Sequence, residues 1–575
     1  MKIIIVLLLS YGMFASGIAQ LENDNQGFLR AYEQEIIDDS ISYKTKTLYE
    51  VNHEARELLN SAKLSKTPYS LLLNAFDMHT KMQNGMFAIL STIEKKEYMK
   101  EHKVYIDALF NATTSNSLHI HSTFNRWINY KRTLFDNENK ILSNKKMRAK
   151  KSLINRKKRE IARLYQERPL RRMVIQGLKS DIERFEKSLS SDLAQFSVDS
   201  KISFDEVSAV LKPNELYIDF AKIGGLYYLF SLDKHQNIGF MKLDAFSIDY
   251  VIKKIQKTRE KIIEKEEFAE IEKAQKNYKE LYRLIMGRVN LKEKTSLIIS
   301  PDGLLNLLPF EALYSQKYLV ETFDIQYVPS AKELLKLHEN SSVSNNKMVL
   351  FANPNFNSDR RENKEVRGDI FRLLTPTFCS LKGTLTEAKK IKSIFPLATL
   401  FSENMATEAN LLNTVSPKIL HLATHGFFLE NEHILNPMLK SGIVLSGANE
   451  SIKKLKGNGV ITALELSELN LKGTELIVLS ACRTGVGKIE EAEGVIGLNK
   501  AFMSAGAKQI IMSLWSVSDG ATALLMEQFY KNIKRGESYS RALNSAKRWM
   551  IMNHKIHPYY WAGFVSSGVN VENLK

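Results

Sequence analysis

The 575-residue chain predicts an α/β fold: a mainly parallel sheet with helices on both faces, preceded by an all-α N-terminal region. Beyond about residue 296, short apolar runs alternate with helical patterns, which is typical of parallel strands joined by covering helices. Between residues 20 and 200, apolar residues recur at helical spacing and proline is nearly absent, which favours helices. A chain of this length is expected to form two or three domains.

The first residues have the pattern of a secretory signal peptide. Met1 and Lys2 precede an apolar run from Ile3 to Ala15, and small residues at 17 and 19 suit a cleavage site. We expect residues 1–19 to be removed near Ala19 and the chain to be exported, to a periplasmic or extracellular space. The alternative is an uncleaved anchor, but the run is shorter than the about 20 residues that a span needs. No other stretch approaches that length, so we expect no transmembrane span in the mature chain.

Residues 20–200 are expected to form a helical region that recruits or senses a protein partner. Clusters such as Leu71 to Leu73 followed by Phe76 have the three- and four-residue spacing of a buried helix face. Helical repeats of about 34 residues would suit this position, but no fixed period is found. Any repeats are therefore degenerate and too few for a long solenoid.

A basic stretch runs from Lys145 to Arg172 within a chain of formal charge +17. It holds thirteen lysine or arginine residues against two glutamates. Such a stripe could attract nucleic acid, an anionic surface or an acidic protein. We favour a solvated helix face, because only Tyr165 supplies an aromatic ring for base stacking and no known nucleic-acid module accompanies the stripe.

Residues 201–575 are expected to form the second domain. It begins with an antiparallel meander of three strands at 215–220, 225–231 and 238–243, and a long charged helix follows at about 248–286. The α/β alternation then places strands at 296–300, 348–352, 399–402, 419–424, 443–445, 476–480, 509–514 and 564–566. Helices are expected between them, among others at 386–394, 494–504, 521–533 and 539–552.

Two apolar runs end in reactive side chains, His425 in segment 418–426 and Cys482 in segment 475–485. Parallel α/β sheets place their sites at the carboxyl ends of such strands. The commonest fate of a cysteine is burial in the core, but here the strand ends at Cys482 and polar, flexible residues follow. The thiolate could attack a peptide carbonyl while the imidazole relays its proton, and the backbone N–H groups of Gly426 and Cys482 could bind the oxyanion. No third member of the site is identifiable.

His421 lies four residues before His425, and His421, Ala423 and His425 share a face if the strand is regular. A buried histidine hydrogen-bonded to backbone is the default for His421. A zinc site of the form His-x-x-x-His needs a helix and usually a glutamate after the first histidine, where this chain has Leu422. We therefore expect no metal, and no cofactor is called for.

Seven motifs occur in a fixed order and together resemble the CHAT domain, a peptidase module related to caspases and separases. The resemblance covers roughly residues 205–570 and implies a caspase-like fold and a cysteine endopeptidase with a His-Cys dyad acting on protein substrates. The histidine also precedes the cysteine by a spacing close to the caspase layout. The motifs are Ser-Pro-Asp-Gly-Leu-Leu-Asn-Leu-Leu-Pro-Phe-Glu-Ala-Leu (300–313), Leu-Lys-Gly-Thr (381–384), Leu-His-Leu-Ala-Thr-His-Gly-Phe-Phe (420–428), Leu-Ser-Ala-Cys-Arg-Thr-Gly (479–485), Ala-Glu-Gly-Val-Ile-Gly-Leu-Asn-Lys-Ala-Phe (492–502), Ser-Leu-Trp-Ser-Val-Ser-Asp (513–519) and His-Pro-Tyr-Tyr-Trp-Ala-Gly-Phe (557–564).

Substrate preference is expected to come from residues beside the nucleophile. Ser480 lies two residues before Cys482 and can line the pocket for the residue that precedes the scissile bond. Separase-like enzymes have a Leu-Trp-Asp-Val-Thr-Asp segment whose aspartate receives a basic side chain. Carried onto this chain, Asp519 would pair with arginine or lysine of the substrate, although Ser516 replaces the first aspartate. The alternative is that Asp519 is a helix N-cap.

The chain has two cysteines, so one disulfide is arithmetically possible in an oxidising compartment. We interpret Cys379 as a small packing residue, with redox locking as a lesser alternative. The sequence thus predicts an exported cysteine endopeptidase that cleaves after a basic residue. The alternative is a non-catalytic CHAT-like scaffold that only binds protein.

Overall fold

The computed structural model describes most of the chain between residues 48 and 568. The described residues are 48–64, 68–134, 147, 149–151, 153–154, 156–157, 160, 172–196, 201–265, 271–335, 345–358, 374, 378–429, 437–454, 458–480, 488–490, 494–515, 517–554 and 557–568. The predicted signal peptide and Cys482 lie outside them. The chain divides into two compact units, residues 1–85 and 86–575.

The first unit contains helix α3 (Leu48–Leu64) and most of helix α4 (Pro68–Ile89). Pro68 stands at the first position of its helix, where its missing N–H costs no intrahelical hydrogen bond. Leu72, Ala75 and Phe76 are buried and follow one another at the spacing of a single helix face. This part of the expected all-α region is therefore helical.

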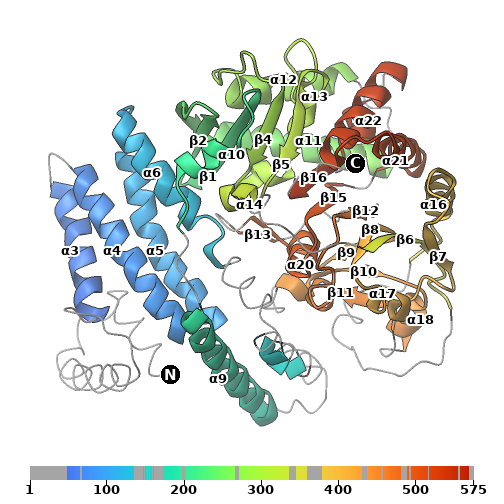
Figure 1. The fold of residues 1–575 in the computed structure, drawn as a ribbon, viewed down its shortest axis with the longest axis horizontal. Helices are drawn as coiled ribbons and strands as arrows, with labels where there is room; N and C mark the ends of the chain where they lie inside the picture. The colour runs from blue at the N-terminus through green and yellow to red at the C-terminus, as the bar shows by residue number, and fades with distance from the viewer. Residues whose placement is uncertain are drawn as a thin grey trace. The chain divides into compact units, whose positions relative to one another are not determined.

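The second unit begins with three further long helices, α5 (Thr92–Ala112), α6 (Ser117–Tyr130) and α9 (Arg172–Phe196). Ser91 and Glu94 form a capping box at the start of α5, and Asn116 caps α6. Figure 1 shows these helices in the blue to green part of the chain.

The basic stretch is described only in part, and two of its described lysines have partners on α9. Lys150 Nζ donates to Ser188 Oγ at 3.0 Å, and Lys157 Nζ lies 2.8 Å from Asp181 Oδ2. These contacts engage part of the positive charge of the basic stretch within the unit. Residues 161–171 lie outside the described part of the chain.

One sheet of eleven strands organises the second unit, in the order β3-β2-β1-β4-β5-β16-β15-β12-β8-β6-β7. The meander β1-β2-β3 is antiparallel, as predicted, and β16 pairs antiparallel with β15. The other neighbours are parallel. The strands are β1 (Glu215–Ile223), β2 (Leu226–Asp233), β3 (Ile238–Asp244), β4 (Ser296–Ser300), β5 (Asp324–Tyr327), β6 (Asn345–Pro354), β7 (Thr399–Glu403), β8 (Pro417–Ala423), β12 (Leu476–Leu479), β15 (Gln509–Ser513) and β16 (Phe564–Gly568).

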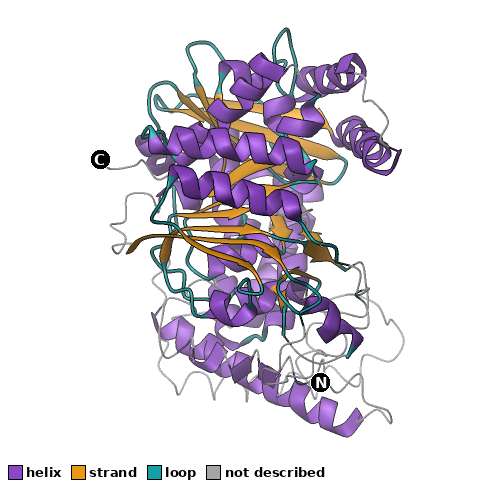
Figure 2. Ribbon diagram, turned by 90° about the vertical axis from the view of Figure 1, so that its right-hand side faces the viewer, coloured by secondary structure: helices purple, strands orange, loops and turns teal. Residues whose placement is uncertain are grey.

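Helices cover the sheet on both faces, and the predicted fold class is confirmed. Figure 1 shows α16 (Lys382–Ile394) and α21 (Asp519–Lys534) on one side of strands β8 and β12, and α20 (Leu498–Ser504) on the other. Figure 2 shows helices packed alongside the strands in the turned view. Strands β12 and β15 are buried throughout, which explains their nearly continuous apolar sequences.

The remaining described elements are short, apart from α11, α12 and α22. They are α10 (Phe204–Val210), α11 (Ala245–Lys265), α12 (Ile271–Ile285), η1 (Gly303–Leu307), η2 (Phe310–Ala312), α13 (Leu319–Thr322), α14 (Ala331–Leu335), α17 (Glu408–Leu412), β9 (Gly426–Phe428), η4 (Pro437–Leu439), β10 (Ser441–Val444), α18 (Ala448–Lys453), β11 (Val460–Thr462), α19 (Ala463–Leu466), β13 (Lys488–Glu490), β14 (Gly494–Ile496), α22 (Tyr539–His554) and α23 (Pro558–Trp561).

Three predicted elements differ from the structure. The helix expected at 248–286 is two helices, α11 and α12, which pack against each other and so bury apolar residues of both, such as Ile252 and Leu281. The strand expected at 443–445 is β10, which belongs to a separate antiparallel sheet β11-β10-β9. The helix expected from residue 494 begins at Leu498, because residues 494–496 form β14 and pair with β13. Strand β5 was not predicted.

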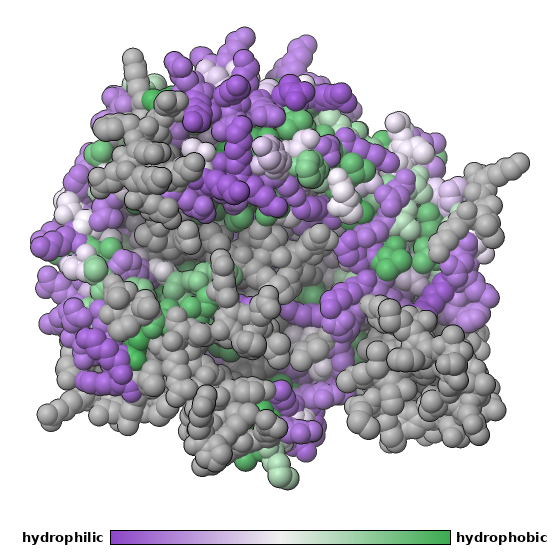
Figure 3. Space-filling view, turned by 180° about the vertical axis from the view of Figure 1, so that it is seen from behind, coloured by the Kyte–Doolittle hydropathy of each residue, from purple (hydrophilic) through white to green (hydrophobic). Residues whose placement is uncertain are grey.

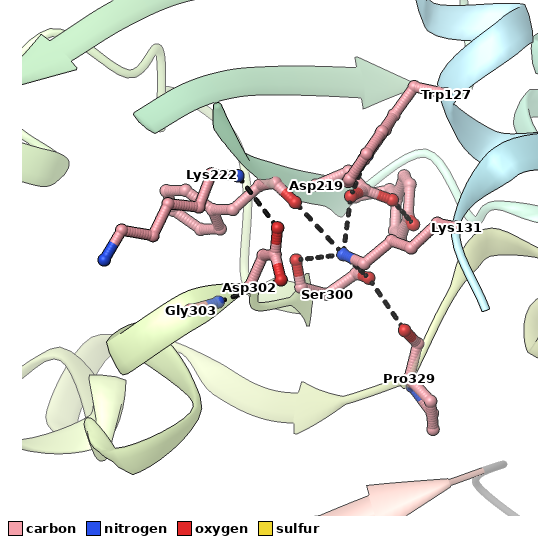
Figure 4. A network of polar contacts seen from close by, with 10 residues as sticks. Trp127, Lys131, Asp219, Lys222, Ser300, Asp302, Gly303 and Pro329 are labelled. Carbon is pink, nitrogen blue, oxygen red and sulfur yellow. Dashed lines mark hydrogen bonds and ion pairs between the residues drawn. The ribbon is translucent and has the colours of Figure 1, made fainter. Parts of the chain in front are cut away.

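A buried polar network joins helix α6 to the sheet (Figure 4). Lys131, at the end of α6, places Nζ 2.8 Å from Asp219 Oδ1 of β1 and 2.7 Å from Ser300 Oγ of β4. Trp127 Nε1 donates to the same Asp219 oxygen at 2.9 Å. The ion pair is almost wholly buried, so the helix and the two strands form one packed body.

Among the described residues, no helix is both long enough and apolar enough to span a membrane. On the face seen in Figure 3, the coloured surface is largely hydrophilic and its apolar residues gather in small patches.

Candidate active site

Strand β8 ends at Ala423, two residues before His425, because the chain leaves the main sheet there. The backbone carbonyl of His425 accepts a hydrogen bond from Val444 N at 3.0 Å, and Gly426 opens strand β9 and pairs with Ile443 of β10. His425 therefore lies at the junction between the main sheet and the small antiparallel sheet. The regular alternation expected from His421 through His425 ends at Ala423.

The imidazole of His425 is held by one backbone oxygen and two aromatic rings. Its Nε2 lies 2.9 Å from the carbonyl oxygen of Cys379. The rings of Phe356 and Phe378 lie 5.3 and 5.5 Å from the imidazole, centre to centre. A carbonyl oxygen can only accept a hydrogen bond, so Nε2 carries the hydrogen and Nδ1 is the basic nitrogen.

Burial lowers the pKa of His425 below its ordinary value of 6.5. The hydrogen bond to the Cys379 carbonyl and the negative charge of Asp519 oppose this effect but do not cancel it. The imidazole is therefore neutral at neutral pH, which is the state that can accept a proton from a thiol.

The strands that lead to the two predicted catalytic residues are neighbours. Leu479 of β12 is paired with Leu422 of β8, and the N–H of Ser480 donates to the Leu422 carbonyl at 3.0 Å. In the sequence, His425 and Cys482 each follow their member of this pair by three residues. Residues 481–487, which include Cys482, lie outside the described part of the chain.

Cys379 is exposed, so its interpretation as a packing residue was wrong. Its segment is instead set by Asn353 of β6, whose Oδ1 accepts from Ser380 Oγ at 2.9 Å and from Leu381 N at 2.8 Å. These bonds place the Cys379 carbonyl against His425. Sequence reasoning missed this oxygen because every residue carries a backbone carbonyl, and no side chain signals which one is used.

Asp519 is exposed, at the first residue of α21, and its negative charge acts to raise the pKa of His425. The N-cap of this helix is Ser518, so Asp519 lies in the first turn, where a carboxylate still interacts favourably with the helix dipole. The carboxylate also contacts Gly383 of α16, since a Cβ added at Gly383 would come within 2.5 Å of Asp519 Oδ2. Gly383 belongs to the Leu-Lys-Gly-Thr motif, which explains why that motif has a glycine.

His421 and Ser480 meet at a buried carboxylate that the sequence did not reveal. His421 is fully buried and has side-chain partners, where a backbone partner was expected: its Nδ1 lies 3.0 Å from the hydroxyl of Tyr530 on α21. Ser480 is also buried, and its Oγ donates to Glu387 Oε2 of α16 at 3.1 Å. No group of three or more metal-binding side chains occurs within the described ranges.

The mostly parallel α/β sheet, with a partly buried histidine at its carboxyl edge, has the caspase-like architecture that the seven motifs imply. The family model of the CHAT domain matches residues 275–569, more than half of the chain. The chain belongs to the CHAT domain family, and the resemblance noted from the seven motifs is confirmed. Strands β1 to β3 precede the match and complete the same sheet.

The chain is similar to two mammalian proteins over part of its length. It is 25% identical to human tetratricopeptide repeat protein 28 over 303 residues, which are 48% of this chain and 12% of that protein. It is 32% identical to the mouse protein of the same name over 115 residues, 20% of this chain and 5% of that protein. The chain thus spans only a small part of these relatives.

Among solved structures, the chain is similar to the separase–securin complex of Saccharomyces cerevisiae and to the Arg-specific cysteine proteinase gingipain R. The separase comparison has a TM-score of 0.44 at 12% identity and covers 91% of this chain and 40% of that chain. The gingipain comparison has a TM-score of 0.32 at 10% identity and covers 52% and 67%.

Proposed function

We propose that the chain is a cysteine endopeptidase in which His425 and Cys482 act on protein substrates. The observation that carries this proposal is the orientation and the neutral form of the His425 imidazole. Its Nε2–H is fixed on the Cys379 carbonyl, and burial keeps the ring neutral at the edge of the sheet where β12 also ends. This arrangement directs the basic Nδ1 away from the carbonyl that orients the ring.

The proposed reaction has two stages. His425 takes the proton of the Cys482 thiol, and the thiolate forms a C–S bond with the scissile carbonyl. The backbone N–H groups of Gly426 and Cys482 stabilise the oxyanion, and the imidazolium returns its proton to the amine as the C–N bond breaks. Water then hydrolyses the thioester and regenerates the thiol. The Cys379 carbonyl orients the imidazole and stabilises its protonated form.

We further propose that cleavage follows arginine or lysine. Asp519 supports this, because its carboxylate is exposed to an incoming side chain and close enough to His425 to raise the histidine pKa. A basic side chain beside Asp519 would lie near the reacting carbonyl and gain a charge-assisted hydrogen bond.

Export and partner binding complete the proposal. The signal peptide pattern of residues 1–19 supports cleavage near Ala19 and a mature chain that acts outside the cytoplasm. The N-terminal helices support recruitment of a protein partner, because α6 and α9 expose large apolar side chains such as Leu118, Met173 and Val174. N-terminal sequencing of protein from the native host tests the first point, and a chain that still begins at Met1 in the membrane fraction would refute it.

Peptide-library cleavage profiling of the mature protein tests the activity. We expect cleavage after basic residues by the parent, and none by variants Cys482→Ala and His425→Ala that retain the parent's circular dichroism spectrum. Cleavage at the parent rate by either folded variant would refute the dyad. Binding of library peptides without any cleavage by the parent would instead favour the non-catalytic scaffold.

A further inference from the structure

A buried carboxylate lies beneath the candidate active site and contacts both strands that lead to it. Glu387 is 2% exposed, His421 is fully buried and Ser480 is 6% exposed. Glu387 Oε2 accepts from Ser480 Oγ at 3.1 Å, and Glu387 Oε1 lies 3.1 Å from His421 Nε2. The second contact has the distance of a hydrogen bond but poor alignment, and neither of its two atoms has another hydrogen-bond partner in the described structure.

The positions of the hydrogens on Tyr530 and His421 follow from the donors and acceptors around them. Burial and the charge of Glu387 raise the pKa of Tyr530 well above its ordinary value, so its hydroxyl stays protonated. We assign that hydroxyl as the donor to His421 Nδ1, 3.0 Å away, which places the ring hydrogen on Nε2. The Nε2–H then faces Glu387 Oε1. The carboxyl group of Glu387 thus accepts a hydrogen bond from Ser480, the residue that follows β12, and faces a ring nitrogen of His421 on β8.

Helix α16, which carries Glu387, also contacts the other parts of the site. The segment just before it holds His425 through the Cys379 carbonyl. Its first turn contains Gly383, which packs against Asp519. One turn further, Glu387 binds Ser480, two residues before Cys482. A single helix is therefore in contact with each chain segment that delivers a proposed functional residue.

We propose that Glu387 is a positioning residue for the nucleophile: through Ser480, it sets where the chain beyond β12 presents the thiol to His425. This inference rests on the proposed function. The buried hydrogen bond between Glu387 and Ser480 is well suited to the task, because a buried Ser480 hydroxyl without this partner would cost free energy and shift the strand end. Small misplacements of a reacting group are costly, about a hundredfold in rate for 1 Å.

The test compares Glu387→Ala with Glu387→Gln, Ser480→Ala and the double variant Glu387→Ala/Ser480→Ala. Glu387→Ala should lower kcat about tenfold to a hundredfold with little change in KM, because it misplaces the thiol without touching substrate. Glu387→Gln should recover most of the rate, since the amide oxygen can face His421 and the amide nitrogen can donate to Ser480. Ser480→Ala should also lower kcat. The double variant should be little slower than Glu387→Ala alone, because the two single variants remove the same hydrogen bond between Ser480 and Glu387.

Alkylation by iodoacetamide supplies a readout that does not require a substrate. In a Cys379→Ser background, the rate at which Cys482 is alkylated should fall in Glu387→Ala together with kcat. The matched control is Glu527→Ala, which removes the ion pair between Glu527 of α21 and Lys390 of α16, at 2.6 Å, without touching β12. This control should leave both rates within about twofold of the parent, as expected of a partly exposed ion pair.

Three outcomes are decisive. Parent values of kcat and of the alkylation rate in folded Glu387→Ala or Ser480→Ala would overturn the inference and leave Glu387 a structural residue. An equal loss in Glu527→Ala would also overturn it, because general docking of α16 would then explain the effect. If the parent cleaves no peptide but Glu387→Ala still slows alkylation, the peptidase proposal fails and the positioning of the thiol by Glu387 stands.

Discussion

Replacing Lys131 by methionine should destabilise the second unit strongly, because it removes the cation that is paired with the buried carboxylate of Asp219. Lys131 Nζ lies 2.8 Å from Asp219 Oδ1, 2.7 Å from Ser300 Oγ and 3.1 Å from the carbonyl oxygens of Phe220 and Ser300. Methionine fills the space of the aliphatic stem, so the change removes charge and hydrogen bonds with little loss of packing.

The expected cost is about 3–5 kcal/mol, the range for breaking a buried ion pair from one side. The side chains of Lys131 and Asp219 are 2% and 0% exposed, so solvent does not screen the charge that remains. The indole of Trp127 still donates to Asp219 in the variant, which places the expectation toward the lower end of the range. In the double variant Lys131→Met/Asp219→Asn most of the loss should be recovered, because no buried charge is left.

Equilibrium unfolding in urea, followed by circular dichroism, measures these differences. The matched control is Lys222→Met, which breaks a pair with Asp249 at 2.6 Å whose side chains are 19% and 16% exposed. Its expected cost is about 1 kcal/mol or less, since solvent reaches the pair. The reasoning would be refuted if Lys131→Met lowered the free energy of unfolding by less than about 1 kcal/mol, or if the double variant were less stable than Lys131→Met. Either result would mean that the buried charge of Asp219 does not depend on Lys131.

Three further predictions concern the site and its surroundings. Asp519→Asn should reduce turnover of arginine peptides about ten- to 150-fold relative to neutral peptides, if binding of substrate desolvates the carboxylate and forms a charge-assisted bond of about 1.5–3 kcal/mol. Gly383→Ala should shift the same preference in the same direction, because the new methyl group would displace Asp519, and comparison of kcat/KM for matched peptides measures both. Burial lowers the pKa of His557 to about 4, so stability should fall by about 3 kcal/mol as the pH falls from 6.5 to 4.

The sign of the last prediction follows from proton binding. Between pH 6.5 and 4 the unfolded chain binds a proton at His557 that the folded chain does not, so acid favours unfolding. Nδ1 of His557 accepts from the N–H of Tyr559 at 3.0 Å as the cap of α23, and an asparagine could keep this role. His557→Asn should therefore flatten the pH dependence of the urea midpoint over this range. An unchanged pH dependence of the urea midpoint in His557→Asn would assign the acid sensitivity to other groups. For Asp519→Asn, an unchanged ratio of kcat/KM between arginine and neutral peptides would show that Asp519 is not part of the substrate pocket.

Local patterns in the sequence were enough to predict the fold class and most of the sheet. The strand at 296–300 was predicted with its observed bounds, and the runs before His425 and Cys482 form parallel strands, as the α/β alternation predicted. That these two strands are neighbours was not predicted. Apolar runs and spacing are properties of adjacent residues, and a buried strand needs little else to be recognised. The one long helix predicted at 248–286 was wrong for the same reason, since helical spacing occurs in both α11 and α12 and does not show that they are two helices packed against each other.

The sequence by itself therefore determined the family, the fold class and the histidine and cysteine that the proposed chemistry uses. Only the tertiary structure decided what surrounds them. The Cys379 carbonyl reaches His425 across 46 residues of chain, and Glu387 reaches Ser480 across 93. Such contacts join residues of ordinary type from distant segments, and they exist because the sheet brings α16 beneath its carboxyl edge. Their energies depend on burial and on the direction of donors and acceptors, which are properties of the packed chain and have no counterpart in local sequence.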